Sequence, residues 1–177
     1  NSKILDLSLS HDFFKKELEQ KKCKVYPIDI HSILKELTYH NLINSNLEKY
    51  DLPISEEVFD TIIILNELQR FNEPEAFIEI LSKWLEKSPH AEIIVTTTNI
   101  SFFMIRFMLF LGFYQHGNKG VLDLSHKRNY TFSSLKKLFE QSGSFKIEKL
   151  IGIPAPFPLA IKNKLVNKTL LFLNNLL

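Results

Sequence analysis

The segment from Phe59 to Leu65 (FDTIIIL) constrains the fold of this chain more than any other. It is apolar on both faces, as a strand is when helices cover both sides of a parallel sheet. The segment from Ala91 to Thr97 has the same buried character. Between them, Glu73 to Lys87 shows the apolar spacing of a helix, with Pro74 in its first turn. We therefore expect two parallel strands joined by a helix.

The rest of the chain continues this alternation of strands and helices. Further strands are predicted at 3–7, 24–30, 41–46 and 145–151, and further helices at 11–22, 33–37, 102–113, 133–141 and 159–177. Ser133 or Ser134 is the expected cap of its helix, and Gly143 the expected end. The alternation predicts a Rossmann-like, doubly wound α/β fold, with a mostly parallel sheet and helices on both faces. Ligands of such folds bind beyond the carboxyl ends of the strands.

Length and charge narrow the class of protein. The 177 residues suffice for one domain, 1–177, and are few for two. With 22 basic and 20 acidic residues, the net charge of +2 gives no basic surface of the kind that binds nucleic acid. Cys23 is alone and forms no internal disulfide. The first residues lack a signal-peptide pattern, and the most apolar run, 101–113, is too short to span a bilayer, so we expect a cytoplasmic protein.

Three stretches together resemble the class I S-adenosylmethionine (SAM) dependent methyltransferases. Ile4 to Asp12 (ILDLSLSHD) is similar to the family's first strand and glycine-rich turn, LDLGCGxG. Phe59 to Glu75 (FDTIIILNELQRFNEPE) is similar to FDxVxxxDVLEHLxDPE. Val121 to Thr131 (VLDLSHKRNYT) is similar to ILDxTHxRFFT, which, like the segment 152–159, is typical of bacterial methyltransferase domains often fused to a glycosyltransferase domain.

The resemblance implies a cofactor, an acceptor and a set of binding residues. The cofactor would be SAM, and the acceptor a small hydroxyl compound such as a sugar or glycolipid precursor. Asp29 would bind the ribose hydroxyls, and Asn46 the adenine amine. The full set of expected cofactor-binding residues is Asp6, Ser8, Ser10, Asp29, Asn46 and Asn66.

The glycine-rich turn departs from the family pattern, and this favours a second interpretation. The family's glycines fall at Ser8, Ser10 and Asp12, and each serine costs about 1 kcal/mol if its backbone must be left-handed. Asp12 would either cap the following helix or repel the carboxylate of SAM from the helix N-terminus. Asn66 replaces a frequent aspartate, and Arg70 a frequent histidine. The alternative is an inactive methyltransferase-like scaffold or regulatory domain that has lost SAM binding.

The second half keeps the family's spacing of polar residues. His126 is the candidate general base that deprotonates a hydroxyl acceptor, and Arg128 could hold a carboxylate or phosphate. The expected substrate-binding residues are Asn99, Asp123, Arg128 and Tyr130. In one alternative, an Asp123–Arg128 pair only staples the loop; in another, His126 and Arg128 bind a ligand unrelated to SAM.

The expected partners follow from the same observations. They are a small-molecule substrate or a fused or associated glycosyltransferase domain, with no nucleic acid. The five other histidines show no ligand spacing, so no metal is expected. The apolar helix at 158–177 would form core, a partner surface or a peripheral membrane contact. The helix at 102–113 is expected in the core, and its alternative is a contact with a membrane or a partner domain. The strand pair that usually ends this fold is not evident in the sequence.

Overall fold

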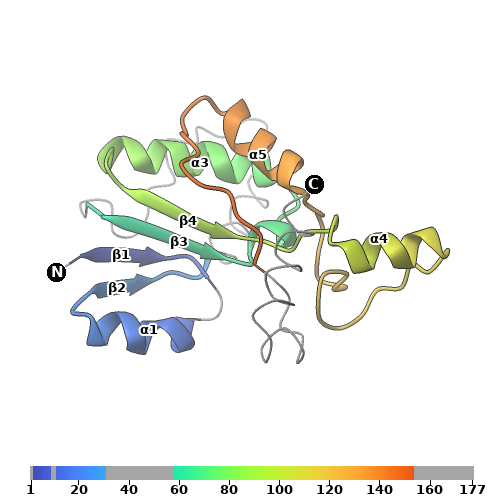
Figure 1. Cartoon of the computed structure of the whole chain (residues 1–177). Helices are drawn as coiled ribbons and strands as arrows, with labels where there is room; N and C mark the ends of the chain where they lie inside the picture. Colours follow the sequence, from blue (N-terminus) through green and yellow to red (C-terminus); the bar gives the residue numbers. More distant parts are fainter. Residues whose placement is uncertain (1, 9–10, 31–57, 154–177) are drawn as a thin grey trace. The chain divides into compact units, whose positions relative to one another are not determined.

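The computed structural model describes residues 2–8, 11–30 and 58–153, and the chain divides into two compact units, 1–97 and 98–177. The first unit holds the sheet (Figure 1). The segments predicted at 33–37, 41–46 and 159–177 lie outside the described residues.

The first unit contains a parallel four-stranded sheet. Its strands are β1 (Lys3–Asp6), β2 (Lys24–Pro27), β3 (Thr61–Leu65) and β4 (Glu92–Thr96), in the order β2-β1-β3-β4. All three pairings are parallel, with Leu5 opposite both Tyr26 and Ile62. The predicted parallel sheet is therefore confirmed, and β3 is an inner strand as expected. The expectation that 91–97 is buried in the same way is wrong, because β4 ends the strand order among the described residues and none of its residues is buried.

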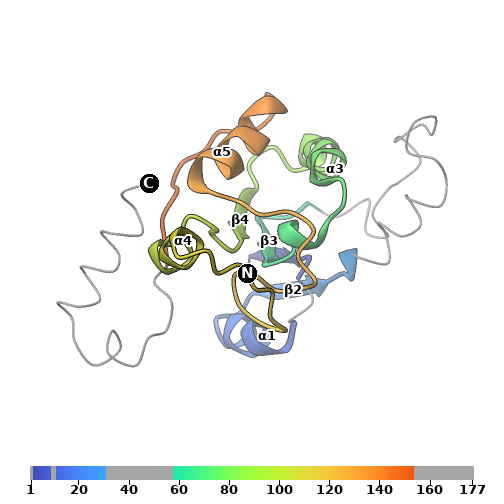
Figure 2. The ribbon, with the colours of Figure 1, turned by 90° about the vertical axis from the view of Figure 1, so that its right-hand side faces the viewer.

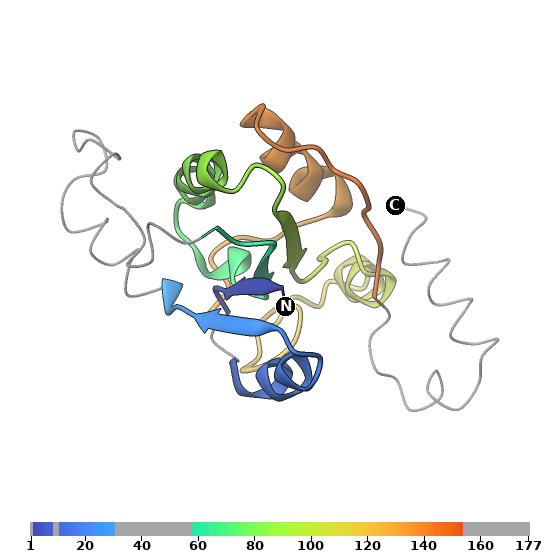
Figure 3. The same cartoon turned by 90° about the vertical axis from the view of Figure 1, so that its left-hand side faces the viewer.

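Two helices cover opposite faces of this sheet. Helix α1 (His11–Gln20) connects β1 to β2, and α3 (Pro74–Lys87) connects β3 to β4, after the short 3₁₀ helix η2 (Leu68–Arg70). Figures 2 and 3 show α1 (blue) on one face and α3 (green) on the other. The connection from β1 to β2 and the connection from β3 to β4 run in opposite directions along the sheet. Because both connections are right-handed, their helices lie on opposite faces. This is the Rossmann-like doubly wound arrangement, with its switch point between β1 and β3.

The core of the first unit lies between the sheet and α3. Ile62 and Ile64 of β3 are buried and alternate with half-buried neighbours, as the two faces of a covered strand require. Phe77 and Leu81 of α3 are fully buried at helical spacing. The side chain of Phe77 meets the ring of Phe71 edge to face, with centroids 4.8 Å apart.

The second unit has less regular structure. It contains α4 (Phe103–Phe110), α5 (Phe132–Gln141) and two isolated parallel bridges, Asn99 with Tyr130 and Gly117 with Asp123. None of the residues of α4 is buried. The expectation that this helix lies in the core is therefore wrong, because its apolar residues surround the helix and select no single face for packing.

The strand predicted at 145–151 is absent from the described part of the chain. Apolar and polar residues alternate from Phe145 to Glu148, but residues 145–151 form no strand. A strand needs a neighbouring strand for its backbone hydrogen bonds, and alternation alone does not specify one.

Helix α5 begins with a reciprocal cap. The Thr131 Oγ1 atom accepts a hydrogen bond from the Ser134 backbone N–H (3.1 Å), and the Ser134 Oγ atom accepts one from the Thr131 N–H (2.8 Å). The prediction of Ser133 or Ser134 as the cap is therefore wrong by two or three residues. Gly143 follows the helix with φ 67°, which confirms it as the predicted end.

Replacement of this cap should destabilise α5. We expect Thr131→Ala to lower the free energy of unfolding by about 1 kcal/mol, because the Ser134 N–H loses its partner. The measurement is urea denaturation followed by far-UV circular dichroism. Ser133→Ala is the matched control, since Ser133 is exposed inside the helix, and a change within about 0.5 kcal/mol is expected for it. Equal losses for both variants would contradict the assignment of the cap.

Candidate functional site

The carboxyl edge of the sheet collects polar residues from several strands. Because the strands are parallel, their carboxyl ends lie at the same edge, where doubly wound sheets bind ligands. Asp6 ends β1, Asn66 follows β3, and Asp29 comes two residues after β2. The Ile28 N–H donates to the Asp6 carbonyl (2.8 Å), so the end of β2 lies beside the end of β1.

Ser8 links β1 to β3 at the switch point. The Leu7 N–H donates to the Ile63 carbonyl (2.9 Å), as in a regular ladder. At the next rung the Leu65 N–H donates to the Ser8 Oγ atom (2.9 Å). The Asp6 Oδ1 atom accepts a hydrogen bond from the Ser8 N–H (3.0 Å), and Asp6 and Ser8 are only 4% and 1% exposed. The Ser8 hydroxyl therefore extends the β1–β3 pairing beyond the last backbone rung.

The backbone of Ser8 is not left-handed. Among the residues that the structure describes, the non-glycine positions with positive φ are Lys22 and Asn66. The strain considered for a serine at the family's first glycine position is therefore not present at Ser8. Ser10, at the second glycine position, lies outside the described residues.

A second polar network joins the ends of β3 and β4. Asn66, with φ 55°, donates its N–H to the Thr96 carbonyl (2.9 Å) and to Thr96 Oγ1 (3.2 Å). The Asn66 carbonyl accepts from Gln69 Nε2 (2.9 Å), and Gln69 Oε1 accepts from the Thr97 hydroxyl (2.8 Å). Sequence reasoning missed Gln69, which is 1% exposed. A buried amide satisfied on both sides fixes the turn after β3.

Two acidic residues remain at this edge as candidates for a cofactor site. The side chain of Asp29 is exposed. Asp12 lies in the first turn of α1, which begins at His11, and the interpretation of Asp12 as the N-cap stays a prediction. Asn46 lies outside the described residues.

In the second unit, a tight turn orients the ring of His126. The Asp123 Oδ1 atom accepts from the Ser125 N–H (2.8 Å), and the Asp123 carbonyl accepts from the His126 N–H (3.0 Å). His126 Nδ1 lies 3.0 Å from the Val121 carbonyl. A carbonyl only accepts, so this contact assigns the proton to Nδ1 and leaves the Nε2 lone pair available in the neutral ring. That tautomer can act as a general base through Nε2.

Asn99 and Tyr130 lie together in the same unit. They form an isolated bridge, and the Ile100 N–H donates to the Tyr130 carbonyl (2.8 Å). The Asn99 Oδ1 atom accepts hydrogen bonds from both the N–H and the hydroxyl of Ser101 (2.9 and 2.6 Å). Asn99 lies three residues before Phe102, the N-cap of α4. The Asn99 Nδ2 atom is buried and has no partner among the described residues. Arg128 is exposed.

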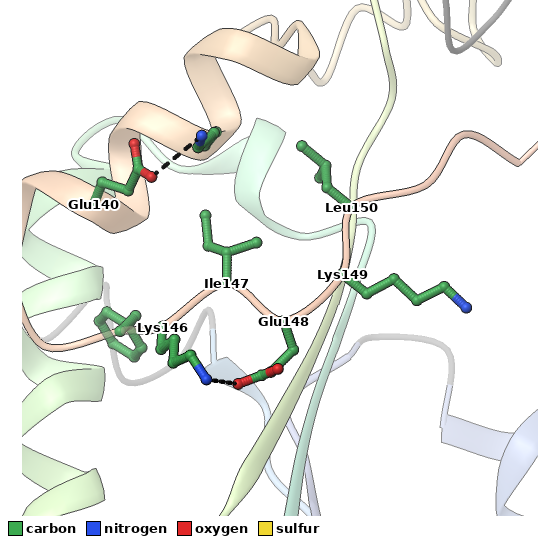
Figure 4. A pocket seen from close by; sticks show the side chains of 8 residues that line it. Glu140, Lys146, Ile147, Glu148, Lys149 and Leu150 are labelled. Carbon is green, nitrogen blue, oxygen red and sulfur yellow. Dashed lines mark ion pairs between the residues drawn. The ribbon is translucent and has the colours of Figure 1, made fainter.

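A groove in the second unit contains none of the predicted site residues. It has a volume of about 520 Å³ and lies between α5 and the extended segment after it (Figure 4). Four of its five charged side chains form two ion pairs, Lys136 with Glu140 (3.5 Å) and Lys146 with Glu148 (2.7 Å), and Lys149 is the fifth. The carboxylate of Glu148 raises the pKa of Lys146. Exposed, mutually neutralised ion pairs give this groove little capacity for chemistry.

Comparison with known proteins gives matches only among solved structures. No protein-family model and no curated protein matches the chain. A SAM-dependent methyltransferase from Aquifex aeolicus is 18% identical, over 86% of this chain and 76% of that one, with a TM-score of 0.49. A SAM-dependent methyltransferase from Archaeoglobus fulgidus is also 18% identical, over 99% of this chain and 80% of that one, with a TM-score of 0.47. The Rossmann-like fold of this chain rests on its own strand order and parallel registers.

Proposed function

We propose that this chain is a SAM-dependent methyltransferase-like domain whose sheet edge binds SAM. The observation that carries the proposal is the exposed Asp29, which follows β2 beside the β1–β3 switch point. A carboxylate at the end of the second strand is suited to the paired hydroxyls of a ribose. Ser8 has no left-handed backbone, and its hydroxyl accepts a hydrogen bond from β3. Both observations support the proposal that serine can replace the family's first glycine.

The proposed reaction is methyl transfer to a small hydroxyl acceptor such as a sugar or glycolipid precursor. When bound, SAM supplies an activated methyl group. The acceptor hydroxyl must lose its proton as its oxygen forms the new bond to carbon, and His126 Nε2 is the proposed base. Arg128, exposed in the same unit, is proposed to hold a carboxylate or phosphate of the acceptor.

A second candidate function is a methyltransferase-like module without activity. Two hydrogen-bond networks favour it. The Ser8 hydroxyl and the Gln69 amide both form hydrogen bonds with residues at neighbouring strand ends, so these groups are already used within the protein. Asp12 places a carboxylic acid in the first turn of α1, where the carboxylate of SAM would otherwise meet the free N–H groups. Such a domain would act as a scaffold or regulator, for example of a glycosyltransferase domain.

Calorimetric titration with SAM and S-adenosylhomocysteine tests the proposal. We expect Asp29→Ala to weaken binding about tenfold or more, because charge-assisted hydrogen bonds to the ribose are lost. Glu79→Ala is the matched control, since it removes an exposed carboxylate from α3. We expect it to leave the affinity unchanged.

The variant Asp12→Gly separates the two candidates. If the wild-type chain binds neither ligand and Asp12→Gly binds both, the carboxylate closes an otherwise competent site. If neither protein binds, the proposal of a SAM site fails and the inactive module remains. If the wild-type chain binds, and Asp29→Ala and Glu79→Ala bind equally well, the assignment of Asp29 to the ribose is wrong.

A further inference from the structure

Helix α4 and the turn after it expose an unusual concentration of large apolar side chains. Phe110 is 84% exposed and Phe107 57%. We call this set the α4 apolar surface: Met104, Phe107, Leu109, Phe110, Leu111, Phe113 and Tyr114, each more than a third exposed. Single exposed apolar residues are common on proteins, but seven large ones within eleven residues are a concentration typical of a contact surface.

The composition of α4 excludes two ordinary explanations for this run. The first is a helix that packs on a core, which buries one face and has a polar face toward solvent. No residue of α4 is buried, and Arg106 is its one charged residue, so α4 is not such a helix. A spanning helix needs about 20 residues, and α4 has 8. None of the helices in the described ranges is long and apolar enough to cross a membrane.

The charges of α4 and of the segment that follows it indicate what the α4 apolar surface contacts. Residues 102–131 contain four cations, Arg106, Lys119, Lys127 and Arg128, and one carboxylate, Asp123, which gives an excess of three positive charges. The four cationic residues are all exposed. Exposed aromatic and leucine side chains flanked by lysine and arginine are the pattern that binds the surface of an anionic bilayer.

We propose that the α4 apolar surface docks on an anionic lipid bilayer. Phe107, Phe110 and Phe113 enter the boundary between headgroups and acyl chains, and Tyr114 keeps its hydroxyl at the headgroup level. Arg106, Lys119 and Lys127 pair with lipid phosphates. The contact is peripheral and reversible, and it does not depend on SAM binding.

Flotation with lipid vesicles tests the proposal on the full chain. The vesicles contain phosphatidylcholine with phosphatidylglycerol, or phosphatidylcholine alone. We expect the wild-type chain to bind the anionic vesicles, and about 0.5 M salt to weaken the binding. We expect the double variant Phe107→Ser with Phe110→Ser to bind about tenfold more weakly or worse, because two exposed aromatic groups no longer enter the lipid.

The matched control replaces exposed apolar residues elsewhere in the same unit. Ile151→Ser with Ile153→Ser changes side chains that are 58% and 69% exposed. We expect the vesicle binding of this variant to stay within about twofold of wild type, because surface substitutions away from a contact have small effects. Circular dichroism checks that both double variants remain folded.

Three results would overturn the proposal. The first is a wild-type chain that ignores anionic vesicles, and the second is equal loss of binding in the two double variants. The third is a chain that self-associates in sedimentation, ignores vesicles, and becomes monomeric when Phe107 and Phe110 are replaced. In that case a second copy of the chain, and not lipid, covers the surface.

Discussion

We expect Phe77→Ala to lower the free energy of unfolding of the first unit by about 3–5 kcal/mol, the largest loss among the changes considered. Phe77 is fully buried on α3, and its ring packs edge to face against Phe71. Truncation to alanine removes the burial of the ring and leaves a cavity that close-packed neighbours fill only partly. A loss of this size is a large fraction of the stability of an ordinary domain.

The single tryptophan makes this measurement specific to the first unit. Trp84 lies on the same helix and is 8% exposed, so its fluorescence reports the unfolding of the packing between α3 and the sheet. Glu79→Ala, an exposed change on α3, should stay within about 0.5 kcal/mol of wild type. If Phe77→Ala costs no more than Glu79→Ala, α3 does not pack through Phe77 as described.

The fold of the first unit could be predicted because its central strands leave a strong signal. β3 and β4 read as short apolar runs, and α3 separates them with helical spacing. β3 lies inside the sheet and buries Ile62 and Ile64, whereas β4 ends the strand order and buries none of its residues. The segment 145–151 alternates between apolar and polar residues from Phe145 to Glu148 but forms no strand. Its pattern describes two faces of a strand and contains no information about a pairing partner.

Capping shows the same limit at the scale of one turn. Thr131, Ser133 and Ser134 all carry hydroxyls at the start of α5. The cap is decided by where the backbone leaves the extended region, and Thr131 has φ −108° and ψ 172°. Three neighbouring hydroxyls therefore allow the helix to be predicted, but its starting residue is predicted only to within two or three positions.

The candidate site was predictable in its location and not in its internal contacts. Parallel strands bring their carboxyl ends together, so Asp6, Asp29 and Asn66 could be placed at one edge. The partner of the Ser8 hydroxyl is the Leu65 N–H, 57 residues away in sequence. The sequence shows only that a serine replaces a glycine and adds a side chain. The hydrogen bond of this side chain to β3 depends on the tertiary structure and cannot be read from the sequence.

The second large effect is expected from Ser8→Ala, which should lower the free energy of unfolding by about 1–3 kcal/mol. The change leaves the Leu65 N–H without its acceptor at a position where Ser8 itself is 1% exposed. The loss is therefore the cost of an unsatisfied donor and not only of one hydrogen bond. Urea denaturation followed by Trp84 fluorescence measures it. Ser82→Ala, which removes an exposed hydroxyl that bonds within α3, should change stability by less than about 0.5 kcal/mol.

Ser8→Gly distinguishes a structural serine from one that contacts the cofactor. Glycine loses the same rung as alanine and adds flexibility, so it should be at least as destabilising, by about a further 0.5–1 kcal/mol. If Ser8 serves only the sheet, the affinity of the folded protein for SAM should be the same for wild type, Ser8→Ala and Ser8→Gly under conditions where all three are folded. A gain of affinity in Ser8→Gly alone would mean that the Cβ atom at this position obstructs SAM. A loss of affinity in both variants, with stability unchanged, would mean that the hydroxyl binds the ligand and that its bond to Leu65 contributes little to the sheet.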